Sequence, residues 1–284
     1  MTTQRSSLQF RAQFERAGAF FRDRPTLEGV LARRLLSAPA PGDASLADHL
    51  ARERRRKSRM DGSLGGSLVL TARALCDLLD LGAQVDDAGA VRMAGYLITR
   101  QNKPGRWSDD GSAGDGFFSP GPREERIAPL ALPTGTTFPD EDDARFVASC
   151  LALRAVLRAG HENRPPVRTH LERVLAIRVP DPHLAFVVVG AVGMAPPEYH
   201  PRIAGLVTGI GGRQGEDGTW PEVTIFHAVD MLLSAPSPAV RALVRKASPH
   251  VAGLQRASGA FDDGEREELA LIALRALDAA RTIA

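Results

Sequence analysis

Gln214-Gly215-Glu216-Asp217-Gly218-Thr219-Trp220 is the stretch of sequence from which the fold of this chain can be argued. A second copy, Gln101-Asn102-Lys103-Pro104-Gly105-Arg106-Trp107, keeps the same spacing of Gln, Gly and Trp. In both copies a helical pattern comes before the Gln, so each copy marks the turn after a helix. A turn motif that recurs in this way indicates an internal repeat.

The repeat has a period of roughly 40 residues, which is in the range of helical-hairpin arrays. Weaker copies at residues 60–64 and 254–261 carry Gly62 and Gly259 at the position of the turn glycine. Gly62 precedes Gly105 by 43 residues, and Gly218 precedes Gly259 by 41. Such a period predicts helical hairpins packed side by side, none of which can bury its apolar face alone. Closing the array into a ring buries those faces.

Helical periodicity extends over most of the chain and predicts an all-α protein of about eleven helices. The one ambiguous segment is residues 184–189, whose β-branched run is also typical of a strand. Its helical neighbours and the lack of a strand partner favour a buried helix. The helices are expected at residues 8–21, 26–36, 45 onward into the basic run 52–59, 67–81, 86–100, 141–159, 166–178, around 184–189, 197–207, 222–234, 238–247 and 264–281.

Composition favours an ordinary globular protein. The 284 residues are enough for a substantial core, and the net charge of +2 gives no argument for a nucleic-acid partner. Cys76 and Cys150 lie in apolar helical patterns, so we expect small buried side chains and a reducing, cytoplasmic location. The longest apolar run, residues 184–195, is shorter than the roughly 20 residues that span a bilayer, and no secretory signal pattern is found at the N-terminus. We therefore expect a soluble protein with no transmembrane segment.

The basic run at residues 52–59 is the one local concentration of charge, Arg-Glu-Arg-Arg-Arg-Lys-Ser-Arg. Most such runs are solvated helix ends, stabilised by the C-terminal end of the helix dipole. The alternative is a contact for an anionic partner such as a diphosphate or a membrane surface. The sequence leaves both interpretations open.

The repeated turn resembles the QW repeat of the squalene-hopene cyclase and terpene cyclase family, and the resemblance covers roughly residues 60–280. It implies a single-domain α/α toroid (an α6/α6-type barrel), with residues 61–284 forming the repeat toroid and residues 1–60 forming helices that pack on it or complete it. In such a turn the Gln side chain satisfies backbone groups at a helix end while the indole stacks over the turn. Trp107 and Trp220 are accordingly expected to be turn staples or, alternatively, to line a cavity.

An acidic stretch, Pro139-Asp140-Glu141-Asp142-Asp143-Ala144, has the shape of the Asp-x-Asp-Asp motif of the class II members of this family. By resemblance, Asp142 is the general acid that protonates an alkene or epoxide, supported by Asp140 and Asp143. Carboxyl groups within a few ångströms of one another cannot all ionise, so one proton is retained at neutral pH. The alternative is that the acids only cap a helix, as at Asp86-Asp87 and Asp262-Asp263.

The remaining site predictions concern the walls of a cavity. His227 is the candidate donor to the catalytic acid, unless it is a core histidine. Phe138, Phe146 and Phe226, with Trp220, are expected to bind substrate, and so thin an aromatic lining favours a small or mono-cyclising substrate. No cofactor is obligatory, although Mg²⁺ bound by the loop acids Asp109, Asp110 and Asp115 is possible if the substrate is a diphosphate.

Three functions remain open at this point. The first is a class II-like terpene cyclase that protonates a linear isoprenoid or prenylated small-molecule substrate, using its own bore or that of a homo-oligomer. The second is a non-catalytic toroid that binds isoprenoids or proteins. The third is an enzyme like the prenyltransferase β-subunit, a class whose zinc site uses Asp, Cys and His. For that site the chain offers only Cys150, seven residues after the acids, and no Asp-x-Cys triplet.

Overall fold

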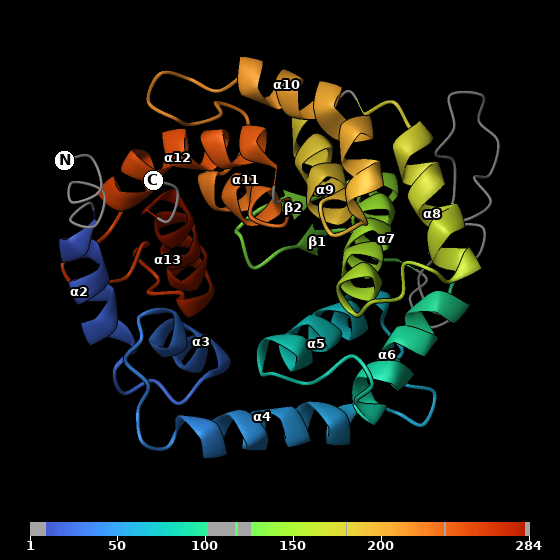
Figure 1. The fold of residues 1–284 in the computed structure, drawn as a ribbon, viewed down its shortest axis with the longest axis horizontal. Helices are drawn as coiled ribbons and strands as arrows, with labels where there is room; N and C mark the ends of the chain where they lie inside the picture. The colour runs from blue at the N-terminus through green and yellow to red at the C-terminus, as the bar shows by residue number, and fades with distance from the viewer. Residues whose placement is uncertain (1–9, 102–116, 119–125, 180, 236, 282–284) are drawn as a thin grey trace.

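The computed structural model describes residues 10–101, 117–118, 126–179, 181–235 and 237–281. Within these ranges the chain folds into α-helices, one 3₁₀ helix (η1) and one two-stranded antiparallel hairpin (Figure 1). The elements are α2 (Arg11–Phe21), α3 (Leu27–Leu35), α4 (Asp43–Lys57), α5 (Leu68–Asp80), α6 (Ala88–Thr99), β1 (Leu130–Ala131), β2 (Thr137–Phe138), α7 (Glu141–Arg158), α8 (Pro165–Ala176), α9 (Pro182–Val192), η1 (Pro197–Ile203), α10 (Ala204–Gly212), α11 (Ile225–Leu232), α12 (Pro238–Gly253) and α13 (Glu267–Arg281).

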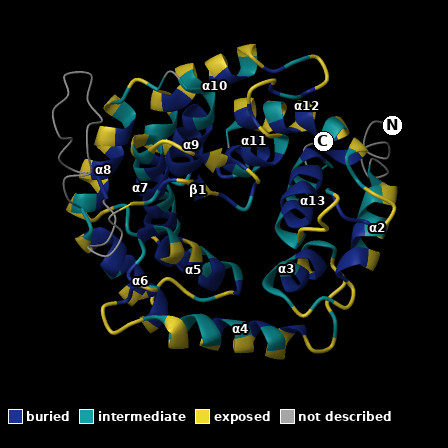
Figure 2. Cartoon of the chain, turned by 180° about the vertical axis from the view of Figure 1, so that it is seen from behind, coloured by how far each residue is buried: buried dark blue, intermediate teal, exposed yellow. Residues whose placement is uncertain are grey.

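The helices form a toroid with an inner and an outer ring, which confirms the predicted all-α fold. The odd-numbered helices follow one another around the inside, since α5 packs on α7, α7 on α9, α9 on α11, α11 on α13, and α13 on α3. The even-numbered helices lie outside them, and the hairpin lies within the ring (Figure 1). Figure 2 shows the inner helices largely buried, whereas exposed residues lie on outer helices such as α4 and α10.

Several helices begin where the sequence predicted. The side chains of Thr26, Ser67 and Asp87 accept hydrogen bonds from backbone N–H groups in the first turns of α3, α5 and α6. The helix expected from Ser45 begins instead at Asp43. The Asp43 carboxylate is buried and accepts hydrogen bonds from Arg33 at 2.9 Å and from the Ala40 N–H group, which fix the chain at this point. The ambiguous segment 184–189 belongs to α9, a helix buried between its neighbours, so the helical interpretation is confirmed.

The turn at Gln214 clamps two helical hairpins together. Gln214 Nε2 donates hydrogen bonds to the carbonyl oxygens of Gly218, in its own turn, and Leu243, in α12, at 2.9 and 3.0 Å. Trp220 Nε1 donates to the Ile210 carbonyl oxygen at 2.9 Å. Gly218 has a φ of +84°, and a Cβ added to it would lie 2.2 Å from the carbonyl oxygen of Lys246 in α12. The motif residues thus hold the turn against the next outer helix.

Gln255 and Gln101 also donate hydrogen bonds to a neighbouring helix or its loop. Gln255 donates to the Gly259 carbonyl oxygen of its own turn and to Gln13 O in α2, and Gln101 donates to Pro166 O in α8. The Gln255 turn therefore joins the C-terminal part of the chain to α2. The second Trp of the motif, Trp107, lies outside the described residues.

The N-terminal helices close the ring. α2 packs on α3, and both contact α13. Arg24, in the turn between α2 and α3, forms an ion pair with Glu267 of α13 at 2.9 Å, and Thr26 donates a hydrogen bond to the same carboxylate. Residues from both ends of the chain therefore share one part of the inner ring (Figure 1).

The basic run on α4 contacts acids of the protein itself. Arg54 forms an ion pair with Asp77 of the inner helix α5 at 3.0 Å, and Arg55 binds Asp87 at the start of α6 at 2.8 Å. These contacts fasten an outer helix to its neighbours, a role that neither sequence interpretation included. In the described part of the chain, no helix is both long enough and apolar enough to cross a membrane.

Candidate functional site

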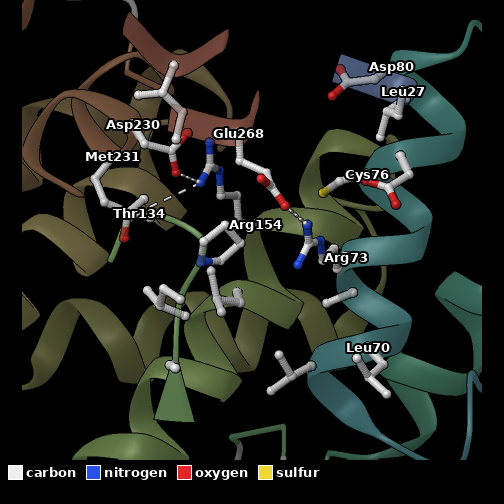
Figure 3. A pocket seen from close by; sticks show the side chains of 18 of the residues that line it. Leu27, Leu70, Arg73, Cys76, Asp80, Thr134, Arg154, Asp230, Met231 and Glu268 are labelled. Carbon is white, nitrogen blue, oxygen red and sulfur yellow. Dashed lines mark hydrogen bonds and ion pairs between the residues drawn. The ribbon is translucent and has the colours of Figure 1, made fainter. Parts of the chain in front are cut away.

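A cavity of about 480 Å³ lies within the toroid, at the inner ring. Its walls come from α3, α5, α7, α11, α13 and the hairpin (Figure 3). Much of the lining is aliphatic, for example Leu27, Leu132, Leu151, Met231 and Leu271. No Phe, Tyr or Trp is among the described residues that line it. Walls of this kind contact an apolar ligand by burial of its surface, not by aromatic stacking.

Three carboxyl groups meet at this cavity from three different helices. Glu28 lies in the first turn of α3, Asp77 on α5 and Glu268 in the first turn of α13. Burial raises the pKa of Glu28, and the neighbouring charges of Glu268, Asp77 and Glu267 raise it further. Burial also raises the pKa of Asp77, against the effect of the Arg54 guanidinium. The acids therefore form one like-charged group, in which retention of a proton relieves repulsion.

Glu28 is the member of this group that has no guanidinium beside it in the described part of the chain. Asp77 is paired with Arg54 at 3.0 Å, and Glu268 with Arg73 at 3.4 Å. Figure 3 shows the contact between Arg73 and Glu268. Among the described residues, Glu28 has no such cationic partner, and no cation offsets its raised pKa. Glu28 is thus a carboxyl group at the cavity wall whose pKa is raised by burial and by neighbouring acids.

The other polar part of the cavity is rich in arginine. Arg154 of α7 forms an ion pair with Asp230 of α11 at 3.1 Å (Figure 3). Asp80, at the end of α5, is held by Arg158 of α7 and by Arg275 of α13, the latter at 3.3 Å. Burial opposes ionisation of Asp80, but these two guanidiniums outweigh it and hold its pKa below the ordinary value.

The predicted acids of the Asp-x-Asp-Asp stretch lie elsewhere. Asp140, Asp142 and Asp143 are together at the start of α7, but none of them lines the cavity, and Asp142 is exposed. The Asp140 carboxylate accepts hydrogen bonds from the N–H groups of Asp142 and Asp143, which would otherwise lack acceptors in the first helical turn. This is the capping arrangement. Burial and the neighbouring charges of Asp140, Asp181 and Asp142 raise the pKa of Asp143.

Glu141 is the acid of that stretch that turns inward. Its carboxylate accepts hydrogen bonds from the N–H groups of Ile127 and Ala128 and forms an ion pair with Arg145 at 2.6 Å. Glu141 thereby fixes the segment that leads into the hairpin, and Ile127 of that segment lines the cavity. Through Glu141, the acidic stretch helps to shape the wall of the cavity.

The predicted His and aromatic residues are buried behind the cavity. His227 Nδ1 lies 3.5 Å from Thr134 Oγ1 and its Nε2 lies 3.4 Å from the His183 carbonyl oxygen. Burial lowers the pKa of His227 to about 4, so the ring is neutral. Phe138 packs edge-on against His227. Since Thr134 lines the cavity, His227 lies one side chain away from it and does not contact the acids predicted from sequence.

The other predicted substrate-binding residues serve the core. Phe146 and Phe226 are buried and do not line the cavity. Trp220 packs edge-on against Phe186, with 5.2 Å between ring centroids, in addition to its hydrogen bond across the turn. The structure therefore supports the staple interpretation of Trp220.

The residues that line the cavity left signals in the sequence that the prediction did not use. Asp77 and Asp80 interrupt the apolar pattern of the helix expected at residues 67–81, where acids are costly unless they have partners. Arg154 and Arg158 are four residues apart on an otherwise apolar helix and so share a face. Glu28 follows an N-cap threonine, in the first turn of a helix, where acids are common because they interact favourably with the helix dipole. Its position therefore did not mark it as a residue of the cavity.

Within the residues that the structure describes, no group of three or more His, Cys, Asp or Glu side chains is placed to hold a metal ion. The loop acids Asp109, Asp110 and Asp115, named as possible Mg²⁺ ligands, lie outside those residues.

Comparison with solved structures shows that the fold is similar to that of a type II terpene cyclase. No family model and no curated protein matches the chain. Among solved structures, the type II terpene cyclase MstE from Scytonema matches as its D109N variant in complex with the substrate geranylgeranyl dihydroxybenzoate, with a TM-score of 0.63, 14% identity and coverage of 100% of both chains. Apo MstE matches with a TM-score of 0.61 and 14% identity over 97% of this chain and 99% of that one. A protein from Actinoplanes matches with a TM-score of 0.62 and 15% identity over 95% and 98%. At these identities the likeness shows the fold.

Proposed function

We propose that this protein is a protonation-initiated terpene cyclase that folds and cyclises an isoprenoid chain in the cavity of the toroid, with Glu28 as the general acid. The observation that carries the proposal is the unpaired, raised-pKa carboxyl of Glu28 at an aliphatic wall. A carboxylic acid that stays neutral at pH 7 is the group that such a reaction requires. The shared fold with a type II terpene cyclase supports the same reaction class.

The reaction follows from this acid. Proton transfer from the Glu28 carboxyl to the terminal carbon of an alkene breaks the O–H bond, forms a C–H bond and leaves a carbocation and a carboxylate. The next double bond of the chain attacks the cation and closes a ring by forming a C–C bond. Loss of a proton from carbon to a carboxylate of the cavity ends the sequence. That carboxyl group releases its proton to solvent, and Glu28 regains one from solvent. The net reaction is an isomerisation and needs no cofactor.

The cavity walls contribute in two ways. Aliphatic side chains such as Leu27, Leu132 and Leu271 exclude water, which would otherwise capture the cation. Aromatic faces, which stabilise cations elsewhere, are not among the described lining residues, whereas the carboxyl groups of Asp77 and Glu268 are. A carboxyl group near a carbocation interacts with it more strongly in this medium than in water.

The substrate class is a linear isoprenoid, free or attached to an aromatic group. A cavity of about 480 Å³ is within the roughly 300–1,000 Å³ of small-molecule sites. The structural neighbour MstE was solved with geranylgeranyl dihydroxybenzoate. The modest volume favours substrates that close one or a few rings.

The experiment that tests the reaction type uses heavy water. The protein is incubated in D₂O with geranylgeranyl dihydroxybenzoate and with farnesyl and geranylgeranyl diphosphates, and products are analysed by mass spectrometry and NMR. The proposal predicts a cyclic isomer with one deuterium at the carbon that was protonated. Binding without conversion of any of these compounds would favour a non-catalytic isoprenoid-binding toroid, and a cyclic product without deuterium would exclude protonation as the first step.

A further inference from the structure

We infer that Asp77 is the base that takes up the proton lost from carbon in the last step, and that Arg54 holds it in position from outside the cavity. This inference rests on the proposed function, because it assigns the end of that reaction to one residue. Arg54 contacts Asp77 but does not line the cavity, so it is a positioning residue. The basic run at residues 52–59, to which Arg54 belongs, thereby gains a role in the reaction.

The first argument is where the cationic partner of each carboxyl group lies. Four carboxyl groups of the cavity wall have a guanidinium partner, those of Asp77, Asp80, Asp230 and Glu268. For three of them the arginine itself lines the cavity, as Arg73 and Arg154 do in Figure 3. Asp77 is instead paired with Arg54 of the outer helix α4, which is not among the described lining residues. A carbocation in the cavity therefore meets Asp77 with the guanidinium of its ion pair behind it.

The second argument is basicity. Burial raises the pKa of Asp77, although the Arg54 guanidinium opposes this effect. Burial acts in the same direction on Asp80, but there two guanidiniums outweigh it and hold the pKa below the ordinary value. A carboxylate with a raised pKa accepts a proton more readily, so Asp77 is the stronger base of the two.

The third argument is position along α5. Leu70, Arg73 and Asp77 are three and four residues apart, so they share the face of α5 that lines the cavity. Leu70 is 50% exposed and the Arg73 side chain 49%, whereas the Asp77 side chain is only 12% exposed. Glu268, the partner of Arg73, is 38% exposed. Asp77 is thus the more sheltered acceptor, where water competes less for the cation.

The Asp77 carboxyl group has one oxygen held and one oxygen available. Arg54 Nε donates a hydrogen bond to Asp77 Oδ2 at 3.0 Å. No described residue donates a hydrogen bond to Oδ1, so Oδ1 is the atom that receives the proton. The charge of Asp77 contributes to the raised pKa of Glu28, so the acid and the base are near enough to interact. Two carboxyl groups in such different surroundings suit opposite roles.

The assigned step breaks a C–H bond next to the cationic carbon, and the electron pair of that bond forms the C=C bond of the product. The proton forms an O–H bond with Asp77 Oδ1 and then passes to solvent. Without this base, the cation loses a proton at another position and gives an isomeric alkene, or it is captured by water. Capture by water, followed by loss of a proton from oxygen, gives an alcohol that is heavier than the alkene by one water molecule.

The test compares the products that the wild type, Asp77→Asn, Arg54→Gln and Arg54→Lys form from geranylgeranyl dihydroxybenzoate in D₂O. Asp77→Asn should still consume substrate and incorporate deuterium, because Glu28 is intact. The share of the wild-type alkene among its products should fall at least about 10-fold, as expected for loss of a general base. Arg54→Gln should shift the product ratio in the same direction, and Arg54→Lys, which keeps the charge, should restore it. Arg55→Gln removes the neighbouring ion pair of α4, with Asp87, and is the matched control that should leave the ratio unchanged.

Failure of the base assignment and failure of the proposed cyclase give different results. The same product ratio in Asp77→Asn as in the wild type, or a wild-type product that is an alcohol, overturns the assignment and leaves the protonation step standing. Loss of all conversion by a folded Asp77→Asn, checked by circular dichroism, also overturns it, because Asp77 would then act before the last step. If Asp77→Asn does not fold, an unchanged ratio in Arg54→Gln, or an equal shift in Arg55→Gln, overturns it. A wild type that forms no deuterated cyclic product refutes the proposed cyclase itself.

Discussion

Gly218→Ala is expected to destabilise the protein strongly, because the turn at Gly218 has no room for a methyl group. The added Cβ would lie 2.2 Å from the Lys246 carbonyl oxygen and 2.8 Å from Ala247 Cα. Both are backbone atoms of α12, so relief requires the turn and the helix to separate. The φ of +84° adds a cost that side-chain-bearing residues pay in the left-handed region, about 1–2 kcal/mol.

The separation would also weaken the hydrogen bonds of Gln214 to Leu243 and Gly218, each of which contributes about 0.5–1.5 kcal/mol. We therefore expect the free energy of unfolding to fall by about 2–5 kcal/mol. Urea unfolding followed by circular dichroism measures this value. Gly209→Ala is the matched control: Gly209 lies inside α10 with nothing within 4 Å of an added Cβ, so alanine should stabilise the helix by about 0.5–1 kcal/mol. If Gly218→Ala proves no more harmful than Gly209→Ala, the clamp role of the turn is refuted.

The further predictions concern buried and partly buried polar groups. Arg33→Met should lower the free energy of unfolding by about 3–5 kcal/mol, measured by urea unfolding, because it leaves Asp43 buried without its cation; a loss under about 1 kcal/mol would contradict this. The Arg33 guanidinium holds the pKa of Asp43 below 3.8, so the stability from this pair is present above that pH and is lost as the pH falls below it. Acid unfolding of the wild type and of Arg33→Met, compared over this pH range, measures the loss. The pKa of Glu28 is raised above 4.5, so the contribution of Glu28 to stability declines as the pH rises from 4.5 toward the folded-state pKa. Glu28→Gln should therefore raise the melting temperature at pH 8 and leave it nearly unchanged at pH 4. Equal melting temperatures of variant and wild type at pH 8 would argue against a raised pKa. Trp220→Phe should cost about 1–3 kcal/mol by leaving the Ile210 carbonyl oxygen unpaired, without changing ligand affinity; weaker ligand binding with unchanged stability would instead make Trp220 a cavity residue.

The fold could be predicted from sequence because its determinants are local. The side chains of Thr26 and Ser67 cap the first turns of α3 and α5, which marks the helix starts in the sequence. Gln214 and Gly218 mark a turn, and the recurrence of this Gln and Gly spacing along the chain indicates an array of hairpins. Each of these signals acts within a few residues, so each is visible in a short window of sequence.

The site could not be predicted in the same way because it is assembled by ring closure. Glu28 and Asp77 are 49 residues apart in sequence, and Glu268 comes from the far end of the chain, yet the three carboxyls influence one another. Which acid of residues 140–143 turns inward was decided by contacts of Glu141 with the backbone at Ile127 and Ala128. The segment at Ile127 and Ala128 and the hairpin after it have no strong periodic pattern in the sequence, so these contacts could not be predicted. The prediction of Asp142 therefore rested on resemblance to the Asp-x-Asp-Asp motif.

The most direct test of the central claim, that the proton donor lies in the cavity, compares Glu28→Gln with Asp142→Asn in the cyclisation of geranylgeranyl dihydroxybenzoate. Both substitutions remove a carboxyl and preserve the shape of the side chain, but only Glu28 lines the cavity. We predict that Glu28→Gln lowers kcat at least 100-fold, as loss of a general acid does, with little change in substrate affinity, while Asp142→Asn keeps near wild-type activity. Full activity in Glu28→Gln together with loss of activity in Asp142→Asn would contradict the account and return the catalytic role to the acidic stretch at the start of α7.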